Sequence, residues 1–261
     1  MSVERIPIEV VMRRDRAVVL AGLASLTLIA WAYLLYHGWR MRSMGTMDMI
    51  PMAMPQVRSW GAVELLLLFV MWAIMMVAMM VPSVAPLILM FARASRRKVA
   101  GRVVGSAAIL LLGYLLVWWG FSALAALAQW SLHGAALLSP MMASTSPALG
   151  GCLLVAAGVF QFTPLKRSCL VRCRSPISFL LSEWRDGRWG TLIMGVKHGI
   201  YCVGCCWILM SLLFVAGVMN LLWVAAIAGF VLVEKAAPVG QGFGRLTGAA
   251  LIVAGIALIV A

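Results

Sequence analysis

The sequence predicts an all-α fold, a polytopic bundle of transmembrane helices, and three observations support this. The chain is 64% hydrophobic and 11% charged, whereas a soluble domain is about half apolar and about a quarter charged. Its apolar residues form runs long enough for helices that cross a bilayer, which takes about 20 residues. Its basic residues cluster between these runs, which is typical of orientation signals in a membrane protein and not of a nucleic-acid-binding surface.

Six to seven spans are expected, because the fourth and sixth apolar runs are short. The first run ends in HGWRMR and not in a small-residue cleavage pattern, so we interpret it as a retained span. The candidate spans are Val18–Tyr36, Gly61–Val81, Val103–Leu127, Ala148–Pro164, Thr191–Phe214, Gly217–Glu234 and Gly244–Ala261.

The distribution of charge predicts a cytoplasmic N-terminus. Seventeen of the 21 Lys and Arg residues fall in the N-terminal segment and in every second connection between spans, which all lie on one face of the membrane. The positive-inside rule makes that face cytoplasmic. We therefore divide the chain into a basic cytoplasmic N-terminus, residues 1–17, and a single transmembrane domain, residues 18–261.

A methionine-rich outer loop is predicted at residues 37–60. Its segment MRSMGTMDMIPMAMP contains Gly, Pro and Asp, which interrupt any helical period. Thioethers are soft ligands that suit Cu(I), so this loop is a candidate collector of metal. The alternative is a flexible connector whose methionines touch lipid. The methionines concerned are Met44, Met47, Met49, Met52 and Met54.

The second span carries two adjacent stripes of methionine. Met75 and Met79 are one helical turn apart, and Met76 and Met80 form a parallel pair beside them. The prolines at 82 and 86 should break this helix near its inner end, and broken membrane helices tend to line cavities. Methionine stripes of this kind usually serve packing, so metal binding and packing both remain open for this span.

The fifth span contains the stretch HGIYCVGCCWILM, which joins three cysteines to a histidine. A helix advances about 100° per residue, so His198, Cys202 and Cys205 share one face, with Cys206 at its edge. Thiolate and imidazole bind Cu(I), and Zn(II) takes the same ligands. The alternative is that the buried cysteines act as small hydrophobic residues.

A second cysteine pair, Cys169 and Cys173, lies in FTPLKRSCLVRCRSP on the cytoplasmic connection that follows the fourth span. Neighbouring arginines favour the thiolate form of such cysteines. The spacing does not decide whether this pair meets the cysteines of the fifth span or consists of unrelated surface thiols.

Charged residues within spans are usually functional. Lys197 precedes the histidine of the fifth span, and Glu234 closes the sixth. We expect the two to form a polar cluster near the cytoplasmic side of the cysteine site, unless they are interfacial residues that extend to the membrane surface.

Several blocks resemble a known family. WAIMMVAMMVPSVAP, QFTPLKRSCLVRCRSP, HGIYCVGCCWILMSLLFVAGVMNLLWVA and VEKAAP, between Trp60 and Pro238, are similar to a bacterial family of predicted metal-binding integral membrane proteins of unknown function. The resemblance implies metal binding in a bacterial inner membrane and supplies no reaction. It points to His198, Cys202, Cys205, Cys206, Cys169, Cys173, Met75, Met76, Met79, Met80 and Glu234.

The leading functional hypothesis is binding of a soft metal for transport or for delivery to a partner. Copper as Cu(I) fits best and zinc is the alternative, and the partner would be a metal chaperone or a membrane metalloenzyme. No nucleotide-binding loop is present in the sequence, so we do not expect ATP-driven pumping by this chain. A binding function is favoured over an enzymatic one, which stays open.

Three alternatives stay open. The first is a membrane thiol–disulfide oxidoreductase that uses Cys202 and Cys205, which would need a second pair on the oxidising face, where the predicted outer loops contain no cysteine. The second is a non-catalytic subunit or assembly factor of a membrane metalloenzyme. The third is a bundle whose cysteines only pack.

Overall fold

The computed structural model describes residues 8–47, 61–96, 103–135, 146–236 and 240–260. Within these ranges the regular elements are helices and no strand occurs, which confirms the predicted all-α class. The helices are α1 (Ile8–Met47), α2 (Ala62–Arg96), α3 (Val103–Gly134), α4 (Pro147–Phe160), α5 (Pro164–Arg174), α6 (Pro176–Glu183), α7 (Gly187–Ser211), α8 (Leu213–Ala216), α9 (Leu221–Ala236) and α10 (Gly240–Val260).

Five helical segments in the described ranges are long and apolar enough to cross a membrane. A sixth span results if α4 and α5, which meet at 66°, form one broken span. The candidate span Gly217–Glu234 is not supported in the same way, because α9 has only 16 residues and is therefore about 24 Å long. The five segments are Arg14–Arg40, Ala62–Ser95, Val103–Gly134, Gly187–Ala216 and Gly242–Val260.

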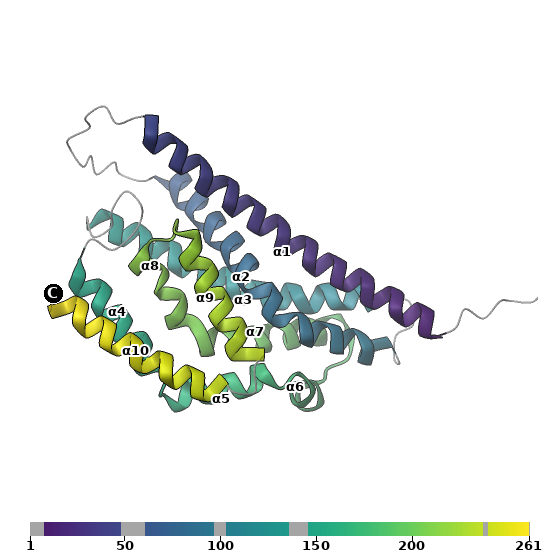
Figure 1. Cartoon of the computed structure of the whole chain (residues 1–261). Coiled ribbons are helices and arrows are strands. Elements are labelled where there is room, and N and C mark those ends of the chain that lie inside the picture. Colours follow the sequence, from purple (N-terminus) through teal and green to yellow (C-terminus); the bar gives the residue numbers. More distant parts are fainter. Residues whose placement is uncertain (1–7, 48–60, 97–102, 136–145, 237–239, 261) are drawn as a thin grey trace, which may run out of the picture.

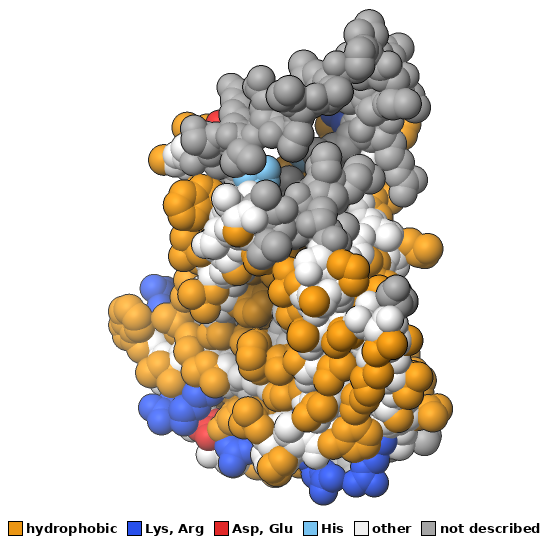
Figure 2. Space-filling view, turned by 90° about the vertical axis from the view of Figure 1, so that its left-hand side faces the viewer, with side chains coloured by type: hydrophobic (Ala, Val, Ile, Leu, Met, Phe, Trp, Pro, Cys, Tyr) orange, Lys and Arg blue, Asp and Glu red, His pale blue; other side chains and the backbone are white. Residues whose placement is uncertain are grey.

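The outer surface has the appearance expected of a membrane domain. Figure 2 shows hydrophobic side chains over much of the molecule's flank and Lys and Arg side chains gathered at one end. The asymmetry agrees with the charge pattern of the sequence, and the cytoplasmic position of the N-terminus stays a prediction.

The core lies where α2, α3 and α7 pack together, with α1 along α2 and with α9 against α2 (Figure 1). Helices α4 and α10 lie side by side at the edge of the bundle away from α1. The largest fully buried side chains include Trp72, Trp118, Tyr114, Met75, Met76, Met80, Met194 and Met210.

Glycines allow α3 and α7 to approach each other closely. A Cβ atom added to Gly195 of α7 would lie 2.1 Å from the carbonyl oxygen of Leu110, and one added to Gly113 of α3 would lie 2.3 Å from that of Leu192. Small residues at a helix contact let the two backbones touch, which is a common way for membrane helices to associate. This contact fixes the position of α7, which carries three of the six cysteines.

Helix α1 is longer than the predicted first span. It extends to Met47, so the first part of the predicted loop 37–60 has a helical backbone. The segment 37–47 contains no proline, and the first proline of the methionine-rich segment is at position 51. Met44 lies on this helical extension. The remaining methionines of the predicted loop, Met49, Met52 and Met54, lie outside the described residues.

Helix α2 continues through both of its prolines, so the predicted break is wrong. Pro82 has no N–H group to donate to the carbonyl of Ala78, one turn earlier. That carbonyl accepts a hydrogen bond from Nε1 of Trp31 in α1, at 3.2 Å. A neighbouring helix therefore replaces the missing bond, which is how membrane helices tolerate proline.

Candidate metal-binding site

The three cysteines of α7 lie within the core of the bundle. Cys202 and Cys205 are each 1% exposed and Cys206 is fully buried. The thiols of Cys205 and Cys206 donate hydrogen bonds to the carbonyl oxygen of Cys202, at 3.1 and 2.9 Å. All six cysteines of the chain are free thiols and not disulfides.

Cys202 is the point at which side chains from three other helices meet. Its sulfur lies 2.7 Å from Nζ of Lys235 in α9 and 3.0 Å from the hydroxyl of Tyr114 in α3. The Lys235 ammonium also donates to Oγ of Ser83 in α2, at 3.2 Å. A thiolate at Cys202 would therefore have a cation and a hydroxyl group in direct contact to balance its charge.

Helix α5 brings a fourth thiol to this cluster. Cys173 is 8% exposed, and its thiol lies beside those of Cys202 and Cys205. Cys169 lies nearby, since a Cβ atom at Gly204 of α7 would be 2.8 Å from its sulfur. The sequence left open whether this pair meets the cysteines of the fifth span. Helix α5, which carries it, packs on α7.

The local sequence explains why α5 begins where it does. Thr163 has an extended backbone and its hydroxyl accepts a hydrogen bond from the N–H of Lys166, at 3.3 Å, while Pro164 occupies the first helical position. A threonine cap followed by proline is a strong helix start. The chain ends α4, turns by 66° and starts α5 at this point, which directs the second cysteine pair toward α7.

His198 lies one turn before Cys202 on α7 and is 3% exposed. Its ring packs against Phe179 and Tyr114, with ring centroids 5.0 and 6.0 Å apart. Its Nδ1 has no hydrogen-bond partner in the described part of the chain. A buried nitrogen without a partner is available as a ligand atom, which is consistent with the role that the sequence suggested.

The methionine stripes of α2 are all in the interior. Met75, Met76, Met79 and Met80 are each at most 2% exposed. Because a helix advances about 100° per residue, all four lie within about 80° of Ser83 around the axis of α2. Ser83 is linked to Cys202 through Lys235, so the thioethers occupy the face of α2 that leads to the cysteine cluster.

Among the described residues, no group of three or more His, Cys, Asp or Glu side chains is arranged to hold a metal ion as they stand. The cluster is therefore a set of adjacent soft ligands and not a closed cage. Cu(I) accepts two-coordinate and three-coordinate sites, so a thiol pair with one further donor can be sufficient.

Glu234 and Lys197 do not form the predicted polar cluster with each other. Glu234 is paired with Lys166 of α5 at 2.8 Å, and both side chains are buried. Lys197 donates to Oε2 of Glu183 in α6 at 2.5 Å, and this hydrogen bond lowers the pKa of the Glu183 carboxyl group. We predicted from the order of the spans that Glu234 and Lys197 would lie together. In the structure each is paired instead with an oppositely charged residue of another helix.

Sequence reasoning missed two residues that contact Cys202. Lys235 was visible as the neighbour of Glu234 at the end of an apolar run, and a lysine in that position is a signal of function. Tyr114 was visible as a single hydroxyl in the apolar segment LLGYLLVWW, and a buried tyrosine hydroxyl generally has a partner.

Comparison with known families adds one finding. A family model described as "PpoB2: Copper chaperone" matches residues 69–258, a range that begins within α2, ends within α10 and contains all six cysteines. No curated protein and no solved structure matches the chain.

Proposed function

The chain belongs to this copper chaperone family, and from that premise we propose that it is a multi-pass protein of the bacterial inner membrane that binds Cu(I) and delivers it to a partner protein. The observation that supports this best is the meeting of Cys173 of α5 with Cys202 and Cys205 of α7. Thiols from two helices that are distant in sequence lie together in the interior.

The donor set favours Cu(I) over Zn(II). Thiolate, thioether and imidazole are soft ligands, and all three types lie in or beside the cluster. Structural zinc sites are almost always tetrahedral with four ligands, and the described residues contain no such preformed group. A pair formed by Cys173 with Cys202 or Cys205, with His198 one turn away, supplies the two or three donors that Cu(I) accepts.

Lys235 would balance the negative charge of the proposed copper site. Two thiolates that hold one Cu(I) carry a net charge of −1, and a net charge within a membrane is costly unless it is compensated. The Lys235 ammonium, 2.7 Å from the Cys202 sulfur, supplies the compensating charge. It contacts Cys202 and Ser83 at once, so it also holds α9 and α2 at the cluster.

The methionines of α2 provide a route to the cysteines. Met75, Met76, Met79 and Met80 line the part of α2 between its N-terminal end and Ser83. Thioethers bind Cu(I) more weakly than thiolates do, so a series of them lets the ion move toward the stronger ligands. The methionines near residues 44–54 would supply the ion to this route from the outer face.

The buried position of the cysteines disfavours a thiol–disulfide oxidoreductase. Exchange requires that a partner thiol reach one of the sulfurs. Cys202 and Cys205 are 1% exposed, whereas a small ion can reach a buried ligand when side chains move.

The test is the copper content of matched cysteine variants. The protein is purified anaerobically in detergent, loaded with Cu(I) and titrated with a chromophoric Cu(I) chelator. Cys173→Ser and Cys202→Ser are compared with Cys152→Ser, because Cys152 is an exposed cysteine on α4. We expect stoichiometric Cu(I) in the wild type and in the Cys152 variant.

The affinity of the two site variants should fall by at least about tenfold, since loss of even an outer-shell partner costs 10-fold to 100-fold in metal affinity. If Cys173→Ser binds Cu(I) as tightly as Cys152→Ser does, the shared site between α5 and α7 is refuted. If neither site variant loses copper while both remain folded, the proposed copper function itself is refuted.

A further inference from the structure

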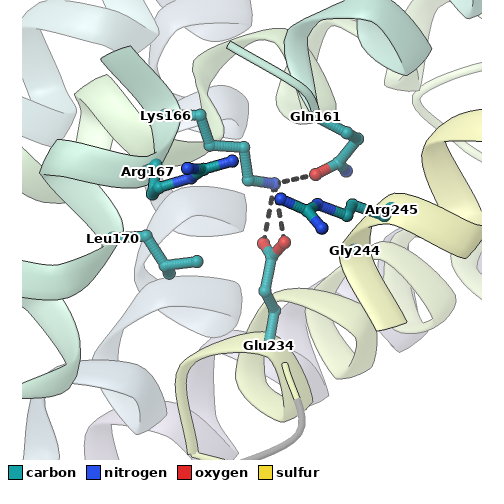
Figure 3. A pocket seen from close by; sticks show the side chains of 7 residues that line it. All are labelled: Gln161, Lys166, Arg167, Leu170, Glu234, Gly244 and Arg245. Carbon is teal, nitrogen blue, oxygen red and sulfur yellow. Dashed lines mark hydrogen bonds and ion pairs between the residues drawn. The ribbon is translucent and has the colours of Figure 1, made fainter. Parts of the chain in front are cut away.

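A second polar site lies at the junction of α4 and α5 with α9 and α10 (Figure 3). It is a small cavity of about 20 Å³, which is enough for one water-sized group. It is separate from the cysteine cluster and includes none of its side chains. The lining residues are Gln161, Lys166, Arg167, Leu170, Glu234, Gly244 and Arg245.

A buried ion pair forms one wall of this cavity. Nζ of Lys166 lies 2.8 Å from both carboxylate oxygens of Glu234, and the two side chains are 3% and 2% exposed. The same ammonium donates to Oε1 of Gln161. The carboxylate, which is the only one among the described lining residues, is therefore already neutralised by Lys166.

The other polar groups of the cavity are donors without acceptors. Nε2 of Gln161 is buried and has no hydrogen-bond partner among the described residues, and the whole side chain is 9% exposed. Figure 3 shows the Arg245 guanidinium directed toward the Lys166 ammonium and the Glu234 carboxylate, with Arg167 on the other side of Lys166. Among the described residues, neither guanidinium group has a hydrogen-bond or ion-pair partner, and both arginines are exposed.

These features indicate which kind of chemical group the cavity can bind. Three cationic side chains and one unpaired amide N–H group surround a single carboxylate, so positive charge and donors are in excess. A buried donor without a partner costs free energy, and an anionic oxygen would satisfy it. The cavity has room for one such oxygen but not for a complete phosphate group, so the rest of the anion must lie outside.

The surroundings indicate where the rest of the anion lies. The first turns of α10 expose two large apolar side chains close to Arg245 in the sequence. They are Phe243 (42% exposed), two residues before it, and Leu246 (72% exposed), the residue after it. Arg245 is therefore at the boundary between lipid-facing apolar side chains and the polar cavity. A phospholipid with its acyl chains along α10 would bring a phosphate oxygen to this boundary, and basic pockets between helices are a known form of lipid headgroup site.

We propose that the cavity formed by Gln161, Lys166, Glu234 and Arg245 binds a phosphate oxygen of an anionic phospholipid headgroup. The unpaired Gln161 amide N–H donates to the oxygen that enters the cavity, while the Lys166 ammonium stays paired with Glu234. The Arg245 and Arg167 guanidinium groups contact the oxygens that remain outside. Because Arg167 belongs to α5, the lipid fastens the helix that carries Cys169 and Cys173 to α10.

The test is lipid-dependent thermal stability of the full chain in detergent, followed by tryptophan fluorescence. Phosphatidylglycerol and inorganic phosphate are added separately at equal concentrations. Arg245→Gln and Arg167→Gln are compared with Arg188→Gln, which changes an exposed arginine at the start of α7 that is absent from the cavity. The buried residues are left unchanged so that the ion pair stays intact.

We expect phosphatidylglycerol to raise the midpoint of unfolding of the wild type and of Arg188→Gln by the same amount. The lipid concentration needed for half of that shift should increase by about tenfold in Arg245→Gln, because a charge-assisted hydrogen bond is lost. Equal midpoints of all variants without lipid show that the substitutions do not disturb the fold.

Two results would overturn the proposal. If Arg245→Gln and Arg188→Gln respond to phosphatidylglycerol alike, the lipid acts by general attraction to basic residues and not at this cavity. If inorganic phosphate produces the same stabilisation as the lipid, the occupant is a free anion and the lipid assignment is wrong. Neither result bears on copper binding, which is measured separately.

Discussion

Replacement of Gly195 by alanine should separate α3 from α7 and disturb the cysteine cluster. The added Cβ atom would lie 2.1 Å from the carbonyl oxygen of Leu110 and 3.0 Å from the backbone nitrogen of Tyr114. Ordinary contact begins at 3.4 Å, and both opposing atoms are backbone atoms that cannot rotate away. The two helices must therefore move apart by about 1 Å, which loosens a packed interior.

The expected cost is worked from this contact. Overpacking of a well-packed interior costs about 1–3 kcal/mol or more, whereas glycine to alanine in an unhindered helix gains about 0.5–1 kcal/mol. The clash therefore outweighs the gain in helix propensity, and the net effect is a loss of stability. Affinity for Cu(I) should fall as well, because Tyr114, whose hydroxyl lies 3.0 Å from the Cys202 sulfur, is part of the same contact.

Gly120→Ala is the matched control, because it makes the same exchange in α3 where no atom lies within 4 Å of the added Cβ. The midpoint of thermal unfolding in detergent and the Cu(I) affinity are measured for both variants. Gly120→Ala should be at least as stable as the wild type. The packing argument is wrong if Gly195→Ala is equally stable and binds Cu(I) equally well.

Three further predictions concern polar contacts between helices. Lys166→Met should destabilise the protein by about 3–5 kcal/mol, because it leaves the buried Glu234 carboxylate without a partner. Adding Glu234→Gln should restore most of the lost stability, measured by thermal unfolding, and a double variant as unstable as Lys166→Met would contradict this. Lys197 lowers the pKa of Glu183 in the folded protein. The pair therefore stabilises the protein fully above the ordinary carboxyl pKa of 4.5, and this stabilisation is lost as the pH falls through the lowered pKa. Lys197→Gln should make the unfolding midpoint less dependent on pH in that acidic range, and an unchanged pH profile would count against the pair. Trp31→Phe should cost about 1 kcal/mol, because the α2 carbonyl freed by the first proline loses its hydrogen bond; chemical denaturation would measure this, and an unchanged stability would mean that another donor replaces the indole.

The helices were predictable to the extent that they depend on local hydrophobicity. The run Val103–Leu127 marked α3, and the run Thr191–Phe214 marked α7, because each is long enough to cross a bilayer by itself. The break at Pro82 was predicted wrongly, since the bond that replaces its missing N–H comes from Trp31, 47 positions from the carbonyl that it reaches.

The candidate site, like the helices, was predictable only where it depends on residues close together in the sequence. The shared face of His198, Cys202 and Cys205 follows from the period of a single helix, so the sequence was sufficient to predict it. Their metal-binding role stays a prediction that the copper titration tests.

The sequence by itself determined the all-α membrane class and the cysteine–histidine face of α7, because both depend on residues near one another in the chain. Only the tertiary structure decided what surrounds Cys202, since Tyr114 and Lys235 are 88 and 33 positions away from it. It also decided that Cys173 joins the cluster and that Glu234 pairs with Lys166 and not with Lys197. Contacts of this kind depend on how the helices pack, and no local pattern of residues specifies that.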